Sequence, residues 1–332
     1  MQNGTKAINR SMSGSKRGYT IDKQFDVIVV GEINPDLILS GDVEPEFGQV
    51  EKLVDEATLT IGSSSAIFAC GAARLGLRVA FIGKIGDDEF GRFMLQSLGD
   101  RGIDMSGVVI DQIVHTGLSV ILSRGNDRAI LTYPGAIPCL GLENIHLDLL
   151  NKARHLHLGG YFIQDRLRPD VPELFEMAHR EGLTVSLDTN FDPSGNWDGG
   201  LSEALSKTDV FLPNETECCA IAEVQDVDQA LIRLMEKVKV VAVKLGARGA
   251  IARYQEDDQQ LLGFARAESL TVEVMDTVGA GDSFDAGFLY GYLNGWEIER
   301  ALRLGTVCGA LSTRKAGGTA AQPIMAEALE FM

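Results

Sequence analysis

Two glycines and an aspartate stand where an apolar run begins, in the stretch DTVGAGDSFDAGFLYGYL at residues 276–293. The residues after Asp282 are small and apolar, which is typical of a buried helix that starts at or near Gly281. A glycine-rich approach leaves free backbone N–H groups at the positive end of a helix, and such an end binds anions. Gly279 and Gly281 would let the backbone come close to phosphate oxygens. The same residues could also form only a helix cap.

Asp282 is expected where its carboxylate can meet an incoming hydroxyl. Phosphoryl transfer needs an acceptor oxygen held in line, a cradle for the charge of the moving group, and a base that takes the hydroxyl proton. The loop could supply the cradle and Asp282 the base, and the helix dipole is expected to keep this carboxylate ionised. For this residue alone, a charge that merely complements the helix N-terminus is an adequate alternative.

The elements that must position these residues alternate along the chain. Short apolar, β-branched runs predict buried strands at 25–31, 78–83, 155–159, 183–188, 209–213 and 238–246. Helical patterns fall at 88–101, 170–181, 215–223, 227–236, 281–294 and 296–313. This alternation predicts an α/β fold with a mostly parallel sheet covered by helices on both faces.

Two regions break the alternation and predict a small second sheet. TGLSVILS at 116–123 and RAILTYPG at 128–135 are separated by RGND, which is typical of a hairpin. The segment after the first strand also has extended character with Pro and Gly breaks. We expect lid strands from about 36–61 and 112–135. Such a sheet could close over a site or simply decorate an edge of the domain.

Composition limits the classes of function. The 332 residues carry a formal net charge of -17, which disfavours nucleic acid as a partner. The five cysteines are scattered without paired CxxC spacing, which favours reduced thiols and a cytoplasmic protein. Residues 1–24 are polar and predict a disordered extension rather than a secretory signal, and we expect no membrane span.

Polar residues and glycines follow several of the predicted strands, where ligands of open parallel sheets bind. They are Asn34, Asp36, Asp188, Asn190, Asp192, Asn214, Glu217, Gly246 and Gly249. Turn and cap chemistry accounts for any one of them, but their gathering at one edge favours a site. Neither GxxxxGK[ST] nor GxGxxG after the first strand occurs, so a P-loop or a dinucleotide fold is not supported.

DTVGAGDSFDAGFL closely resembles the C-terminal signature of the PfkB/ribokinase family of carbohydrate kinases. GEINPDL, GKIGDDEFG, NETE, VKLGARGA and STRKAGGTAAQP resemble further motifs of that family, so the resemblance covers nearly the whole chain from about residue 25. It implies a ribokinase-like three-layer α/β/α kinase domain over 25–332, with a mostly parallel central sheet and a small β-sheet lid.

The resemblance also implies roles for individual residues. Asp282 would be the catalytic base, and Gly279, Ala280 and Gly281 with the Asp282 amide would form the anion hole. The ATP site would contain Asn214, Glu217, Lys244, Gly246 and Gly249. Glu217 would organise Mg²⁺ through water, and Asp276 matches the acidic ligand of a monovalent cation site, with K⁺ as the candidate. Asn34 and Asp36 would bind sugar hydroxyls.

The substrate pocket departs from the family pattern. Gly62 matches the first glycine of the N-terminal signature, Ser63 replaces the second, and Ile67 stands where an asparagine is expected. Ser63, Ser64 and Ser65 are candidate replacement donors. Kinases for acidic keto-sugars often carry an arginine where Asp192 stands, and an acid there would repel a substrate carboxylate, which favours a neutral sugar or polyol.

The expected function is ATP-dependent phosphorylation of a hydroxyl group on a small neutral sugar or polyol. A nucleoside or vitamin kinase of the same fold is one alternative, and a non-catalytic sugar-binding homologue is another. A homodimer that associates through the lid is a further expectation.

Overall fold

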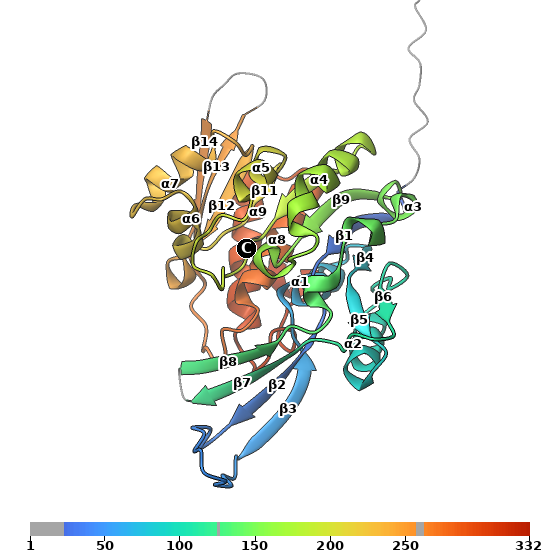
Figure 1. Ribbon diagram of the computed structural model, residues 1–332. Coiled ribbons are helices and arrows are strands. Elements are labelled where there is room, and N and C mark those ends of the chain that lie inside the picture. Colours follow the sequence, from blue (N-terminus) through green and yellow to red (C-terminus); the bar gives the residue numbers. More distant parts are fainter. Residues whose placement is uncertain (1–22, 125–126, 257–261) are drawn as a thin grey trace, which may run out of the picture.

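An eight-stranded sheet runs through the centre of the protein in the order β14-β13-β12-β11-β10-β9-β1-β4 (Figure 1). The computed structural model describes residues 23–124, 127–256 and 262–332. Six neighbouring strands are parallel: β1 (Phe25–Val30), β4 (Val79–Ile82), β9 (Ala153–Leu158), β10 (Thr184–Leu187), β11 (Val210–Phe211) and β12 (Val240–Lys244). Two antiparallel strands complete one edge, β13 (Ala250–Gln255) and β14 (Leu262–Ala267).

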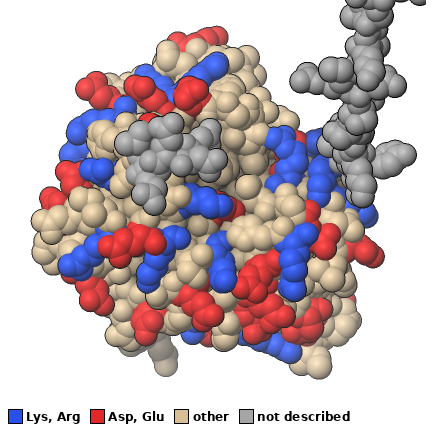
Figure 2. All heavy atoms as spheres, turned by 90° about the horizontal axis from the view of Figure 1, so that it is seen from above, with Lys and Arg blue, Asp and Glu red and all other residues tan. Residues whose placement is uncertain are grey.

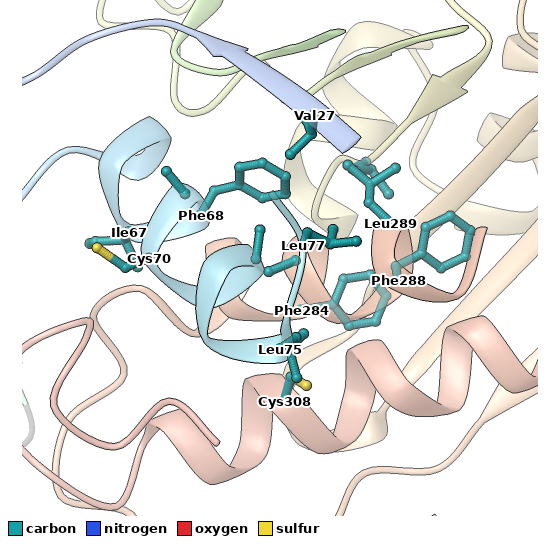
Figure 3. Packing of buried hydrophobic residues seen from close by; sticks show 14 of the residues in the cluster. Val27, Ile67, Phe68, Cys70, Leu75, Leu77, Phe284, Phe288, Leu289 and Cys308 are labelled. Carbon is teal, nitrogen blue, oxygen red and sulfur yellow. The ribbon is translucent and has the colours of Figure 1, made fainter. Parts of the chain in front are cut away.

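Helices cover both faces of this sheet, so the expected three-layer α/β/α fold is confirmed. One core packs beneath α1 (Ser64–Leu75), α2 (Glu89–Gly99), α8 (Ala280–Leu293), α9 (Ile298–Ser312) and α10 (Met325–Leu329). The other packs beneath α3 (Leu147–Leu150), α4 (Val171–Arg180), α5 (Leu201–Ser206), α6 (Glu215–Ile221) and α7 (Val227–Leu234). Figure 3 shows Phe68 of α1 and Phe284, Phe288 and Leu289 of α8 in the first of these cores.

A separate four-stranded sheet forms the lid, below the main sheet in Figure 1. Its order is β3-β2-β7-β8, from β2 (Pro35–Ser40), β3 (Glu56–Ile61), β7 (Leu118–Arg124) and β8 (Asp127–Tyr133). One face carries Asp36, Thr60 and Ser119 in register. The opposite face carries Leu37, Leu39, Leu59, Val120, Leu122 and Leu131. The period of two therefore separates an apolar face from a mixed face, on which Ile38, Ile121 and Ile130 lie between the polar residues.

The lid strands lie in the expected segments but fill only part of them. Residues 41–55 contain no strand, and a two-stranded parallel pair joins β5 (Lys84–Gly86) to β6 (Val109–Asp111). The β13–β14 edge was not predicted, because its exposed residues interrupt the apolar pattern of a buried strand. The proposed extension over 1–24 falls almost entirely outside the described residues, as do the tip of the RGND turn and residues 257–261.

Charge is mixed over the described surface seen in Figure 2, where blue and red side chains are interspersed rather than gathered by sign. Among the described helices, none has the length and apolar character needed to cross a membrane.

Candidate active site

The glycine-rich loop at 276–281, here called the anion loop, leads directly into α8. Helix α8 begins at Ala280, one residue before the expected start, and Gly279 is its N-cap with a φ of 70°. A Cβ atom at Gly279 would lie 2.8 Å from the Cα of Gly318 and 2.8 Å from Cγ2 of Ile67. Both the positive φ and the crowding against Gly318 and Ile67 require glycine here. The approach of this backbone to phosphate oxygens stays a prediction.

Ile67, which stands where the family pattern has an asparagine, is part of this crowding. Its side chain is buried, and a Cβ atom at Gly318 would lie 2.5 Å from its Cδ1. The amide of Gln322 donates to the Ile67 carbonyl and to the Ser283 hydroxyl, at 2.9 and 3.0 Å. The Ile67 side chain, on α1, therefore packs against Gly279 of the anion loop and against Gly318.

Three carboxylates converge beside the first turn of α8. Asp188, Asp282 and Asp285 each offer an oxygen within 4.8 Å of the others. The Nζ atom of Lys244 lies 2.8 Å from Asp188 and 3.1 Å from Asp285, so an ammonium group already occupies part of this cluster. Burial lowers the pKa of Lys244, but the charges of Asp188 and Asp285 outweigh it and raise the pKa overall. The lysine is therefore a fixed positive charge next to Asp282.

The environment of Asp282 differs from the expectation that a helix dipole keeps it ionised. Burial raises the pKa of this carboxyl well above its usual value, and the charge of Asp188 raises it further. Lys244 acts in the opposite direction without reversing the shift. The pKa shift is opposite in direction to the effect expected of the α8 dipole, because desolvation and neighbouring carboxylates outweigh that dipole. A carboxylate with a raised pKa is a stronger base towards an incoming hydroxyl.

A cavity of about 610 Å³ lies next to the lid, and a second cavity of about 480 Å³ lies beside the anion loop. The second cavity brings together five of the expected ATP and anion residues, Lys244, Gly246, Gly249, Ala280 and Gly281. Its apolar wall is made by Leu270, Val272, Val274, Phe284 and Ala310. A nucleotide base could pack on this wall while its phosphates approach the N-terminus of α8.

Asn214 and Glu217 form a capping box at the start of α6. The Glu217 N–H donates to Asn214 Oδ1 and the Asn214 N–H donates to Glu217 Oε2, each at 2.9 Å. Burial, followed by the charge of Asp188, raises the pKa of Glu217 to about 7. The cap interpretation of NETE is therefore confirmed, and the same carboxylate interacts electrostatically with Asp188 and Lys244 in the cluster.

Glu32 binds Ser63, which replaces the second glycine of the N-terminal signature, and the two serines that follow it. Its Oε2 accepts a hydrogen bond from the Ser65 hydroxyl at 2.6 Å, and its Oε1 accepts from the Ser64 hydroxyl at 2.5 Å. Ser63 donates to the Glu32 carbonyl and caps α1. Asn190, in the left-handed region with a φ of 55°, donates to Ser64. Glu32 was missed because a lone acid after a strand resembles a turn residue.

Asn34 and Asp36 lie at the junction of the main sheet and the lid. Both are buried, and the Asn34 amide donates to the Pro35 carbonyl at 3.2 Å. A Cβ atom at Gly62 would lie 2.0 Å from Asp36 Oδ1, so this glycine makes room for the carboxylate. Asp192 lies apart from them: its carboxylate accepts hydrogen bonds within its own turn, from Ser194 and Trp197.

Asp276 is held by three donors. Its Oδ1 accepts from the Val278 N–H at 2.9 Å and from Arg128 Nη1 at 3.3 Å, and its Oδ2 accepts from the Gly317 N–H at 2.9 Å. The arginine comes from strand β8 of the lid. Sequence reasoning did not identify Arg128, because only the folded hairpin brings it to the anion loop.

A three-layer fold with a lid, a glycine-rich helix start, a half-buried aspartate in its first turn and a nucleotide-sized cavity defines a small-molecule kinase of the ribokinase type. The sequence matches the pfkB family carbohydrate kinase description over residues 24–325, and the chain belongs to this family. It is 30% identical over 329 residues to a 5-dehydro-2-deoxygluconokinase of Geobacillus thermodenitrificans, covering 93% of this chain and 94% of the relative. The protein is therefore a carbohydrate kinase.

Solved structures agree with this fold. Adenosine kinase from Sinorhizobium meliloti is 25% identical with a TM-score of 0.79, covering 92% of this chain and 99% of that chain. A ribokinase II of E. coli in complex with ATP and Mg²⁺ is 24% identical with a TM-score of 0.80, covering 92% and 98%.

Proposed function

We propose that the protein transfers the γ-phosphoryl group of ATP to a hydroxyl group of a small neutral sugar or polyol, with Asp282 as the base. The observation that carries this proposal is the position of Asp282 in the first turn of α8, beside the cavity that contains Lys244, Gly246 and Gly249. The anion loop and the carboxylate are thus adjacent, as phosphoryl transfer requires.

In the proposed reaction the acceptor hydroxyl gives its proton to the Asp282 carboxylate as its oxygen bonds to the γ-phosphorus. The bond from that phosphorus to the bridging oxygen breaks, and ADP leaves. The backbone N–H groups of the anion loop stabilise the charge that develops on the transferred group. Lys244 holds Asp188 and Asp285 in place, so the geometry around the base is fixed before substrate binds.

The residues present also fit a magnesium ion, because Mg²⁺ takes oxygen ligands and keeps several waters. Glu217, with Asn214, would hold it through water, near Asp188 and Lys244, with which Glu217 interacts electrostatically. When bound, the ion neutralises phosphate charge during transfer.

Buried acids favour a neutral substrate. Glu32 and Asp36 are both almost fully buried near the junction with the lid, and burial raises the pKa of Asp36 to about 7. Carboxylates so placed accept hydrogen bonds from sugar hydroxyls, whereas a carboxylate on the substrate would add to the repulsion. The name 5-dehydro-2-deoxygluconokinase of several relatives favours a second candidate, an acidic keto-sugar.

A screen of ATP consumption tests the substrate class, with purified protein and Mg²⁺ over neutral pentoses, hexoses, polyols, acidic keto-sugars and nucleosides. We expect turnover on a neutral sugar or polyol, and turnover about 10²–10⁴-fold lower with Asp282→Asn. Turnover confined to an acidic keto-sugar would support the second candidate, and turnover confined to nucleosides would support a nucleoside kinase.

A further inference from the structure

Arg128 connects the lid to the anion loop. Its Nη1 atom donates to Asp276 Oδ1 and to Thr277 Oγ1, each at 3.3 Å. In the strand register Arg128 lies opposite Ser123, on the same face of the lid sheet as Asp36. One face of the lid thus carries a candidate sugar ligand and a cation that reaches the loop next to Asp282.

The hydrogen-bond donors around Asp276 occupy the carboxylate oxygens to which a monovalent metal ion would bind. Both of its oxygens accept hydrogen bonds from backbone N–H groups, of Val278 and Gly317, and the guanidinium of Arg128 lies on Oδ1. A potassium ion bound to Oδ1 would lie next to the guanidinium of Arg128, whose Nη1 is 3.3 Å from the same oxygen. Two positive charges so close together repel each other. With the lid in this position, the site does not fit the ion that the family pattern implies.

The charge balance of the adjoining cavity supports the same conclusion. This cavity of about 610 Å³ lies between the lid strands and the loops around Asp276 and Gly317. Among the described residues that line it, the acids are Glu56, Asp127 and Asp276, and the basic residue is Arg128. Loss of Arg128 would leave three carboxylates facing one cavity without a lining cation.

We propose that Arg128 is a built-in cation for Asp276, which orders the anion loop when the lid covers the site and makes transfer independent of added potassium. Arg128 is a positioning residue: it acts through Asp276, whose Oδ1 also holds the Val278 N–H at the start of the glycine turn. Because Arg128 and Asp36 share one face of the lid, movement of the lid over a sugar would bring both groups in together.

The first test is thermal and needs no substrate. We would compare the melting temperature in potassium chloride with that in tetramethylammonium chloride at equal ionic strength, for the wild type, Arg128→Gln, Arg128→Lys and Arg124→Gln. Arg124 is the matched control, because it lies on the same hairpin and pairs with Glu44, and both side chains are exposed. We expect a potassium-specific rise of about 2 °C or more in Arg128→Gln alone, since an ion that binds only the folded state stabilises it.

The second test is kinetic and uses the best substrate from the screen. Wild-type kcat should be unchanged by potassium, and Arg128→Gln without potassium should lose about 10-fold in kcat through a displaced anion loop. Arg128→Lys should regain part of that loss, and Arg124→Gln should match the wild type. A potassium-specific thermal shift in the wild type, or an Arg128→Gln variant indistinguishable from Arg124→Gln, would overturn the proposal. If no substrate is turned over, the thermal comparison still decides it.

Discussion

Asp36→Asn tests the electrostatics of the substrate pocket, because it removes a charge with almost no change in shape. Asp36 lies on β2 of the lid with 6% of its surface exposed. Burial raises its pKa from the usual 3.8 to about 7, against the hydrogen bond from Ser119, which lowers it. An asparagine can still accept the Ser119 hydrogen bond but carries no charge.

The size of the effect follows from that pKa. A rise from 3.8 to about 7 corresponds to about 4 kcal/mol of free energy between the protonated and ionised forms in the fold. Folding raises the pKa of Asp36, so the folded protein favours the protonated carboxyl. The contribution of Asp36 to the free energy of unfolding is therefore fully present below about pH 4 and is lost as the pH rises through 7. Asparagine does not titrate. The variant should therefore be more stable than the wild type at pH 8, by about 2–4 kcal/mol once the cost of burying an amide is allowed for.

The assay is a melting temperature at pH 5 and pH 8. We expect the variant to gain several degrees relative to the wild type at pH 8 and much less at pH 5, at about 2 °C per kcal/mol. Asp42→Asn is the control, because its carboxylate is exposed and its pKa is lowered by Lys52. An equal difference between variant and wild type at both pH values would refute the reasoning. The KM for sugar should rise about 10-fold or more through loss of a charged acceptor.

Three further predictions concern the base, the core and the lid. Asp282→Asn should lower kcat by about 10²–10⁴-fold with nucleotide affinity nearly unchanged; near-normal turnover would exclude Asp282 as the base. Burial lowers the pKa of His157 to about 3. The free energy of unfolding should therefore be about 2 kcal/mol lower at pH 5 than above pH 6.5. Urea unfolding of His157→Gln should show a pH dependence that lacks this decrease. The apolar lid face around Leu131, which is 61% exposed, should form a homodimer interface. Leu131→Glu should then sediment as a monomer and Ile113→Glu, outside the lid, as a dimer; a monomeric wild type would contradict this.

Local sequence determined the layers of the fold, the lid strands and the anion loop. These features depend on short-range physics: buried parallel strands are apolar runs, and a tight helix start needs glycine. Gly279 is an example: it is a glycine in the tight turn that enters a helix, where a positive φ is common, and its φ is 70°. The same reasoning placed Asp282 in the first turn of α8.

Only the tertiary structure decided which groups meet and how their charges interact. Burial and the charge of Asp188 outweigh the dipole of α8 at Asp282, which reverses the expected effect on its pKa. Ile67 turned out to pack on Gly279 and Gly318, although the three residues are far apart in the chain. Arg128 reaches Asp276 across 148 residues, and no local pattern marks that pair. Desolvation and ion pairing depend on distance in space, so the sequence determined the elements and the fold determined the site.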